Sequence, residues 1–166
     1  MPRGHFTVLD TPFLEDGSVD EAGLRHNVRL TRARPGVGGI SLHSLHQEFW
    51  VLTLAERRQV TEIALDEVAG RVPVAVGCSD SVVENVLALA DHAAAHGAAL
   101  AMVWPPLYGP RSPDSVHDYY AAIAPRIRLG MVIYSTTLSE MGFYLDLGRW
   151  RRCFVFPPSP ACRTPR

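Results

Sequence analysis

The stretch that decides the fold is Gly38–Arg58, GGISLHSLHQEFWVLTLAERR. An apolar run ends in a polar turn that carries two histidines, and a helix signature follows at once. Thr53 is a favourable helix N-cap and Glu56 stands three residues later, which predicts a capping box. A strand that ends in a polar turn and leads into a helix is one βα unit. Since repeated βα architectures gather their chemistry at the carboxyl ends of such strands, this turn is the first candidate for a site.

Further βα units flank this stretch on both sides. The expected strands are 6–9, 37–42, 72–76, 99–103 and 131–134, and the expected helices are 20–33, 53–69, 81–96 and 114–125. On the first helix we expect Leu24, Val28 and Leu30 to be buried, and on the second Val60, Ile63, Ala64 and Val68. Strands that alternate with helices indicate an α/β fold with a parallel sheet. Because a full eight-fold barrel needs at least about 200 residues, pattern alone favours an open, flavodoxin-like sheet over a barrel.

The composition is that of a soluble globular protein, with 47% hydrophobic residues and a net charge of −1. That charge gives no reason to expect nucleic acid or an anionic membrane as a partner. No apolar run reaches the roughly 18 residues of a membrane-spanning helix, and the N-terminus lacks the apolar segment of a signal peptide, so we expect a cytoplasmic protein. All 16 basic residues are arginine. No lysine amine is therefore present to form a Schiff base.

The sequence changes character after Trp150. The final segment is dense in proline, arginine and cysteine and has no periodicity. One interpretation is a disordered tail. The other, which we favour because the change falls within a final helix predicted to start near Asp146, is an aberrant end such as a shifted reading frame. We therefore expect a domain over residues 1–150 and a tail over residues 151–166.

Several stretches together resemble the dihydrodipicolinate synthase / N-acetylneuraminate lyase family of class I pyruvate aldolases. These are TPFLEDGSVD (11–20), EFWVLTLAERR (48–58), GRVPVAVG (70–77), AAHGA (94–98), DYYAAIA (118–124) and MVIY (131–134). Their order and spacing fit the family over about residues 5–150. The resemblance implies a truncated (β/α)8 TIM barrel, with about five βα units of parallel strands. It replaces the flavodoxin-like expectation.

The resemblance also implies a mechanism through a Schiff base between pyruvate and a lysine on the sixth strand. The chain leaves the family pattern before that strand, so we expect it to be inactive alone. Tyr134 matches the tyrosine of the family's Y-N-x-P motif, a proton relay beside the imine, and Ser135 replaces the asparagine of that motif. Tyr108 matches the second tyrosine of a P-P-Y-Y segment that in the synthases reaches into a neighbouring subunit's site.

The family's G-T-T-G-E loop, which holds the pyruvate carboxylate, aligns with residues 44–48. Only its glutamate is kept. Leu45 cannot relay a proton, whereas His46 could replace a hydroxyl donor, and backbone N–H groups could still bind a carboxylate. The resemblance therefore places the substrate-binding positions at Leu45, His46, Glu48 and Ser135.

Two alternatives to this assignment concern histidines. His43, His46 and Glu48 lie within one loop, but no third ligand follows at a familiar spacing, so we favour substrate contact over metal binding. His92 and His96 share one helix face, which we interpret as a solvated surface. We expect no metal and no cofactor.

Two functional hypotheses follow. The chain is either part of a lyase that acts through a 2-oxo acid Schiff base, or a non-catalytic α/β fragment that associates with a full-length homologue. A homo-oligomer is possible in either case.

Overall fold

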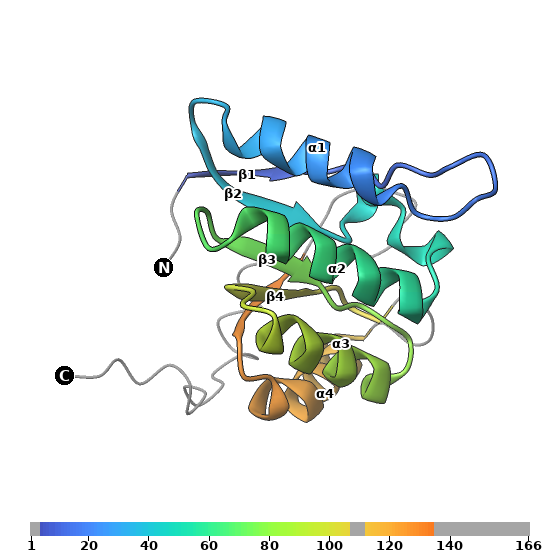
Figure 1. Cartoon of the computed structure of the whole chain (residues 1–166). Helices are drawn as coiled ribbons and strands as arrows, with labels where there is room; N and C mark the ends of the chain where they lie inside the picture. Colours follow the sequence, from blue (N-terminus) through green and yellow to red (C-terminus); the bar gives the residue numbers. More distant parts are fainter. Residues whose placement is uncertain (1–3, 107–111, 135–166) are drawn as a thin grey trace. The chain divides into compact units, whose positions relative to one another are not determined.

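The structure, a computed structural model, describes residues 4–106 and 112–134. Its strands are β1 (His5–Val8), β2 (Val37–Leu42), β3 (Val74–Gly77), β4 (Leu100–Val103) and β5 (Gly130–Ile133). They belong to one sheet in the order β1-β2-β3-β4-β5 (Figure 1). A doubly wound sheet reverses its strand order at a switch point, whereas a (β/α)8 barrel adds each strand beside the last. The open sheet that pattern alone favoured is therefore wrong, and the barrel-type arrangement implied by the resemblance is confirmed.

The helices lie where the sequence predicts them. They are α1 (Glu21–Arg32), α2 (Leu54–Val68), α3 (Val83–Ala95) and α4 (Pro113–Ile123). Three short 3-10 helices were not predicted: η1 (Leu45–Gln47), η2 (Phe49–Val51) and η3 (Ala124–Arg126). None of the described helices combines the length and apolar character that crossing a bilayer requires.

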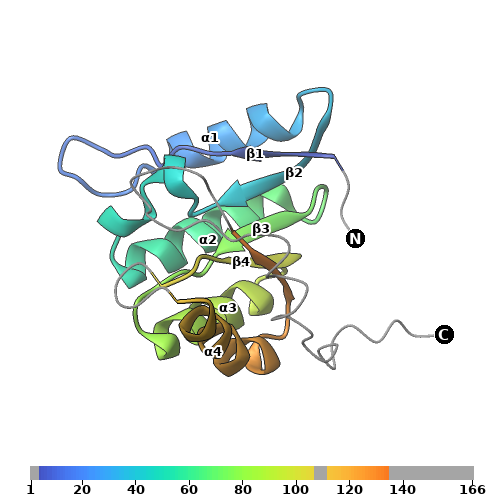
Figure 2. The ribbon, with the colours of Figure 1, turned by 180° about the vertical axis from the view of Figure 1, so that it is seen from behind.

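The chain divides into two compact units, of which the first comprises Met1–Gly77 and His92–Leu100. Its strands β1, β2 and β3 pair in parallel. Helices α1 and α2 cover the same face of these strands, in front of them in Figure 1 and behind them when the view is reversed in Figure 2. The core between the layers contains fully buried aliphatic side chains, among them Leu24, Ile40, Leu42, Val60 and Val76. Each such side chain stabilises the fold by about 1.5–3 kcal/mol.

Helix α1 is capped at its start and buried along one face. Asp20 caps it by accepting a hydrogen bond from the backbone N–H of Gly23 at 2.9 Å. Leu24 and Val28 are buried as predicted, but Leu30 is 50% exposed and Thr31 is buried instead. The prediction for Leu30 is wrong because positions 24, 28 and 31 continue one helix face, whereas position 30 lies beside it.

Helix α2 begins with the predicted capping box. The Thr53 hydroxyl accepts from the Glu56 backbone N–H at 3.2 Å, and the Glu56 carboxylate accepts from the Thr53 backbone N–H at 2.7 Å. The predicted apolar residues Val60, Ile63, Ala64 and Val68 are all buried. Two polar side chains, Arg57 and Thr61, are buried on this helix as well, with 3% and 2% exposure. Both contribute to the site described below.

The second unit comprises Cys78–Asp91 and Ala101–Arg166. Helix α4 is capped by Ser112, whose hydroxyl accepts from the Ser115 backbone N–H at 3.1 Å. Its buried side chains, Val116, Tyr120 and Ile123, follow one helix face. The backbone N–H of Tyr134, directly after β5, donates to the carbonyl of Val103 at the end of β4, at 3.1 Å. This bond fixes the chain at the carboxyl end of β5.

Candidate functional site

The turn after β2 has a strained backbone. His43 and Glu48 adopt left-handed conformations, with φ of 52° and 49°, and they bracket the short helix η1. Residues other than glycine enter this region at a cost, and such positions cluster at functional sites. The turn therefore has a defined shape that its surroundings must maintain.

His43 is the centre of that support. Its Nε2 lies 3.0 Å from the backbone oxygen of Arg57 and 2.9 Å from the hydroxyl of Thr61. The Thr61 hydroxyl donates its own proton to the same Arg57 oxygen at 2.8 Å. Because a carbonyl oxygen only accepts, Nε2 carries the proton and Nδ1 carries the lone pair. Burial, reinforced by the charge of Arg57, lowers the pKa of His43 to about 3, so the ring is neutral at physiological pH.

Arg57 ties the turn to the end of β3. Its Nη2 donates to the carbonyl of Gly77 at 2.9 Å, and its guanidinium lies 5.1 Å from the centre of the Phe49 ring. Gly77 must lack a side chain, because a Cβ atom there would lie 2.9 Å from the carbonyl carbon of His43 and nearer still to its oxygen. The turn and the strand end therefore pack backbone against backbone. Sequence reasoning missed Arg57, although a charged residue four positions before Thr61 in a buried stripe was an available signal.

Three buried polar atoms of this turn have no hydrogen-bond partner within residues 4–106 and 112–134: His43 Nδ1, Ser44 Oγ and Gln47 Nε2. Ser44 and Gln47 are 5% and 4% exposed. The Gln47 side-chain oxygen accepts from the His43 backbone N–H, so its amide nitrogen has both protons available. Each unpaired buried group costs about 1–3 kcal/mol. The turn thus offers hydroxyl and amide donors, which suit a carboxylate, and one imidazole acceptor.

The predicted substrate-binding residues of the turn lie around these donors. Leu45 is half-buried, and both His46 and Glu48 are exposed. Their assigned contacts with substrate stay a prediction. His43, His46 and Glu48 are not brought together as ligands in the described part of the chain, where the group with metal-ligand spacing is instead Glu62, His92 and His96.

Tyr134, the predicted proton relay, lies in the second unit. Its ring stacks on that of Trp104, with centroids 4.3 Å apart and planes 9° from parallel. Trp104 is buried directly after β4, and its backbone N–H donates to the hydroxyl of Ser79 at 2.9 Å. The stacked pair holds the tyrosine ring at the carboxyl ends of β4 and β5. No local pattern predicted this role of Trp104 and Ser79. The predicted residues Tyr108 and Ser135, and the tail over residues 151–166, lie outside the described residues.

Tyr119 and Tyr120 lie on α4 in the same unit. The Tyr120 hydroxyl donates to the carbonyl of Val103 at 3.1 Å, and burial raises its pKa. Burial and the charge of Asp80 raise the pKa of Tyr119 to about 12. Both phenols are therefore neutral at physiological pH.

Comparison with known proteins adds the decisive observation. The model of the Dihydrodipicolinate synthetase family matches residues 1–143. The chain belongs to this family. The 4-hydroxy-tetrahydrodipicolinate synthase of Bartonella quintana is 31% identical over 135 residues, which are 81% of this chain and 46% of that protein. The same enzyme of Methanothermobacter thermautotrophicus is 31% identical over 145 residues, which are 87% of this chain and 50% of that protein. The chain thus spans about half the length of these relatives.

Solved structures of similar proteins support the same assignment. N-acetylneuraminate lyase from Fusobacterium nucleatum superposes with a TM-score of 0.82 at 25% identity, over 90% of this chain and 51% of that one. A prophage protein of the dihydrodipicolinic acid synthase family from E. coli K12, solved in complex with pyruvate, has a TM-score of 0.75 at 27% identity, over 86% of this chain and 47% of that one. The five strands and the helices α1 to α4 described above therefore correspond to about half of a family barrel.

Proposed function

We propose that this chain supplies the N-terminal part of the active site of a lyase that acts on a 2-oxo acid, such as pyruvate, through a Schiff base. The observation that carries the proposal is the pair of buried donors, Ser44 and Gln47, in the turn that aligns with the family's carboxylate-binding loop. The pyruvate complex of the prophage relative supports the choice of ligand. The whole reaction needs more than this chain, because the nucleophilic amine is missing from its 166 residues.

In the proposed reaction this chain binds the substrate, and a lysine outside this chain is the nucleophile. The Ser44 hydroxyl and the Gln47 amide hold the carboxylate. A lysine amine attacks the 2-oxo carbon, water leaves as the imine forms, and a carbon–carbon bond is then broken or made at the adjacent carbon. Tyr134 relays protons to and from the substrate oxygen. With a pKa of about 3, His43 is unsuited to proton transfer at neutral pH and acts as a positioning residue for the turn.

The first test measures carboxylate binding by the 166-residue chain alone, with pyruvate titrated and followed by NMR. We expect a Kd on the order of 1 mM. A hydrogen bond to a charged group contributes about 1.5–3 kcal/mol, so Ser44→Ala should weaken binding about 10-fold or more. Gln47→Glu keeps the oxygen that accepts from His43 but replaces the donor with a negative charge, and should abolish binding.

The matched control is Ser18→Ala, which removes an exposed serine hydroxyl from a distant turn and should leave the Kd unchanged. Undiminished pyruvate binding by both Ser44→Ala and Gln47→Glu would refute the assignment of these donors.

The second test asks whether the chain completes an active site. The chain is mixed with the C-terminal half of a family enzyme that carries the Schiff-base lysine, and pyruvate-dependent turnover and borohydride trapping on that lysine are measured. Tyr134→Phe keeps the ring that stacks on Trp104, so it should lower turnover about 100-fold or more without preventing association. Turnover by this chain alone would overturn the proposal. Association without turnover would favour the non-catalytic fragment.

A further inference from the structure

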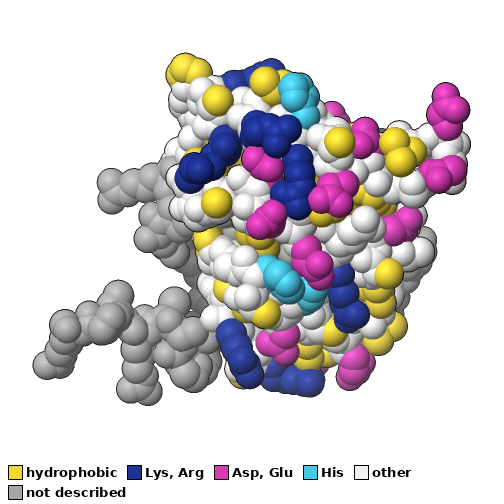
Figure 3. Space-filling view, in the orientation of Figure 1, with side chains coloured by type: hydrophobic (Ala, Val, Ile, Leu, Met, Phe, Trp, Pro, Cys, Tyr) yellow, Lys and Arg dark blue, Asp and Glu magenta, His cyan; other side chains and the backbone are white. Residues whose placement is uncertain are grey.

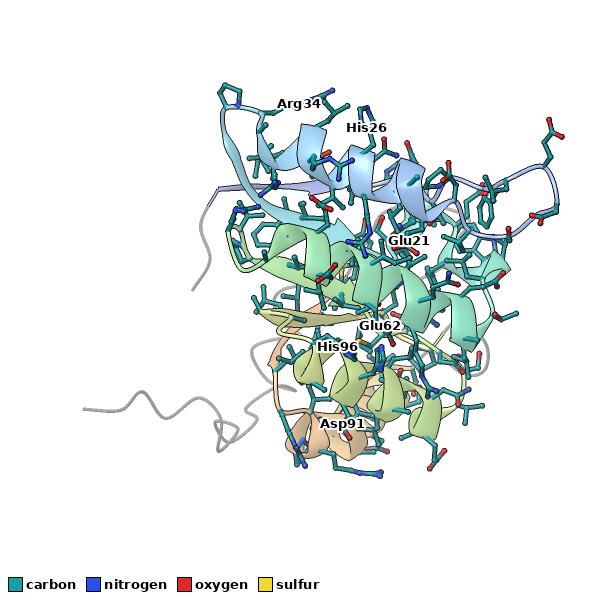
Figure 4. The ribbon with its side chains drawn as sticks, in the orientation of Figure 1. Glu21, His26, Arg34, Glu62, Asp91 and His96 are labelled. Atoms are coloured by element: carbon teal, nitrogen blue, oxygen red, sulfur yellow. The ribbon has the colours of Figure 1, made fainter. Side chains whose placement is uncertain are left out.

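A group of three metal-binding side chains lies between α2 and the end of α3, apart from the turn after β2. His92 and His96 are one helical turn apart, and their ring centroids are separated by 4.3 Å. Glu62 on α2 places its Oε1 atom 3.2 Å from His92 Nε2. Figure 3 shows histidine side chains beside acidic ones on this face, and Figure 4 shows Glu62 and His96 close together. All three residues belong to the first compact unit.

The ring nitrogens are arranged as in ligating histidines. His96 Nδ1 lies 2.9 Å from the backbone oxygen of His92, so it carries the proton and leaves the Nε2 lone pair available. The His92 ring hydrogen-bonds the backbone carbonyl of Arg58, while its Nε2 faces Glu62. A histidine that binds a metal almost always donates its other N–H in this way.

We propose that Glu62, His92 and His96 bind a divalent transition-metal ion, with zinc as the favoured ion. The three ligand atoms lie within 4.8 Å of one another. Two ligand atoms about 2.1 Å from a tetrahedral zinc are roughly 3.4 Å apart, so the site closes by a movement of about 1 Å. The Glu62 side chain, which is 50% exposed, and the exposed His96 have the freedom to make it. Water completes the coordination, and the ion joins α2 to α3.

The ligand set selects the metal class. Two imidazoles and one carboxylate suit zinc, nickel and copper, whereas calcium and magnesium prefer sites made of oxygen atoms alone. Within the described residues no other three-membered group of histidine, cysteine and carboxylate side chains has such spacing. The site is independent of the proposed reaction, because none of its residues lies in the turn after β2 or beside Tyr134.

The test is zinc titration of the metal-stripped 166-residue chain by calorimetry. We expect one zinc ion per chain with a micromolar Kd. His96→Ala and Glu62→Gln change exposed side chains, so the fold should persist by circular dichroism, and each should weaken binding at least 10-fold. The matched control His26→Ala removes an exposed histidine of α1 and should leave the Kd unchanged.

A second readout separates this site from the cysteines. Cobalt(II) bound by imidazole and carboxylate lacks the strong near-ultraviolet charge-transfer bands of thiolate ligation, so their absence is expected. Zinc should also raise the Tm of the parent chain and not that of His96→Ala, because ion binding to the folded state stabilises it. Equal zinc affinity in parent and His96→Ala, thiolate bands with cobalt, or no binding at about 100 μM zinc would each overturn the proposal.

Discussion

Acidification should destabilise this chain through His43 in particular. The ring is 1% exposed, and its pKa falls from an ordinary value of 6.5 to about 3 in the folded protein. At pH values between about 3 and 6.5, His43 is therefore protonated in the unfolded chain and neutral in the folded chain. For a group with a depressed folded-state pKa, the stability present above pH 6.5 is lost as the pH falls toward 3.

The size of the effect follows from the linkage relation. One pKa unit corresponds to 1.36 kcal/mol, and the unfolded chain gains most of a proton over the roughly 1.5 units between pH 6.5 and pH 5. His43 should therefore remove about 2 kcal/mol from the free energy of unfolding between pH 7 and pH 5. The measurement is urea unfolding followed by circular dichroism at both pH values, on the parent and on His43→Gln. Glutamine places an amide near the position of Nε2 but does not titrate.

The difference between the parent and His43→Gln removes the contribution of all other titrating groups to the change in unfolding free energy. Asp16 and Glu56, whose hydrogen bonds lower their pKa values, are present in both proteins. Their contributions to the change in unfolding free energy are therefore the same in the parent and in His43→Gln. The parent should therefore lose about 2 kcal/mol more than His43→Gln. His26→Gln, which replaces an exposed imidazole on α1, should lose as much as the parent. Equal losses in the parent and His43→Gln would refute the inference that His43 is buried and neutral.

Three further substitutions test the supports of the fold. Gly77→Ala should cost about 3 kcal/mol in unfolding free energy, because its Cβ would meet the His43 carbonyl; unchanged urea stability would contradict this packing. Thr53→Ala should cost about 1 kcal/mol by removing the cap of α2, whereas Thr53→Ser should not, as thermal unfolding of the pair will show. Tyr120→Phe should cost about 1 kcal/mol by leaving the buried carbonyl of Val103 without its phenol donor, and a stability equal to that of the parent would speak against this bond.

Local sequence patterns predicted most of the secondary structure. The expected strand 37–42 is β2, and the capping box at Thr53 forms as expected. These features depend on residues within a few positions of one another, so local propensity and periodicity suffice to find them. Leu30 was mispredicted on the same basis, because its neighbour Thr31 continues the buried face more closely.

The candidate site was less predictable. The resemblance selected the turn of residues 44–48, but the buried donors are Ser44 and Gln47, and the predicted His46 and Glu48 face solvent. His92, expected on a solvated face, has a side chain only 19% exposed that pairs with Glu62 on another helix. Both differences arise because burial and pairing depend on segments that are distant in the chain.

The order of residues in this chain was enough to indicate alternating βα units, the family, and the lack of a lysine nucleophile. Those conclusions depend on residue types and on local spacing. Only the folded structure showed that Gly77 lies against the backbone of His43 and that Arg57 and Thr61 reach the turn. The physical reason is desolvation: whether an imidazole is neutral, or a buried donor is unpaired, depends on which distant groups exclude water from it.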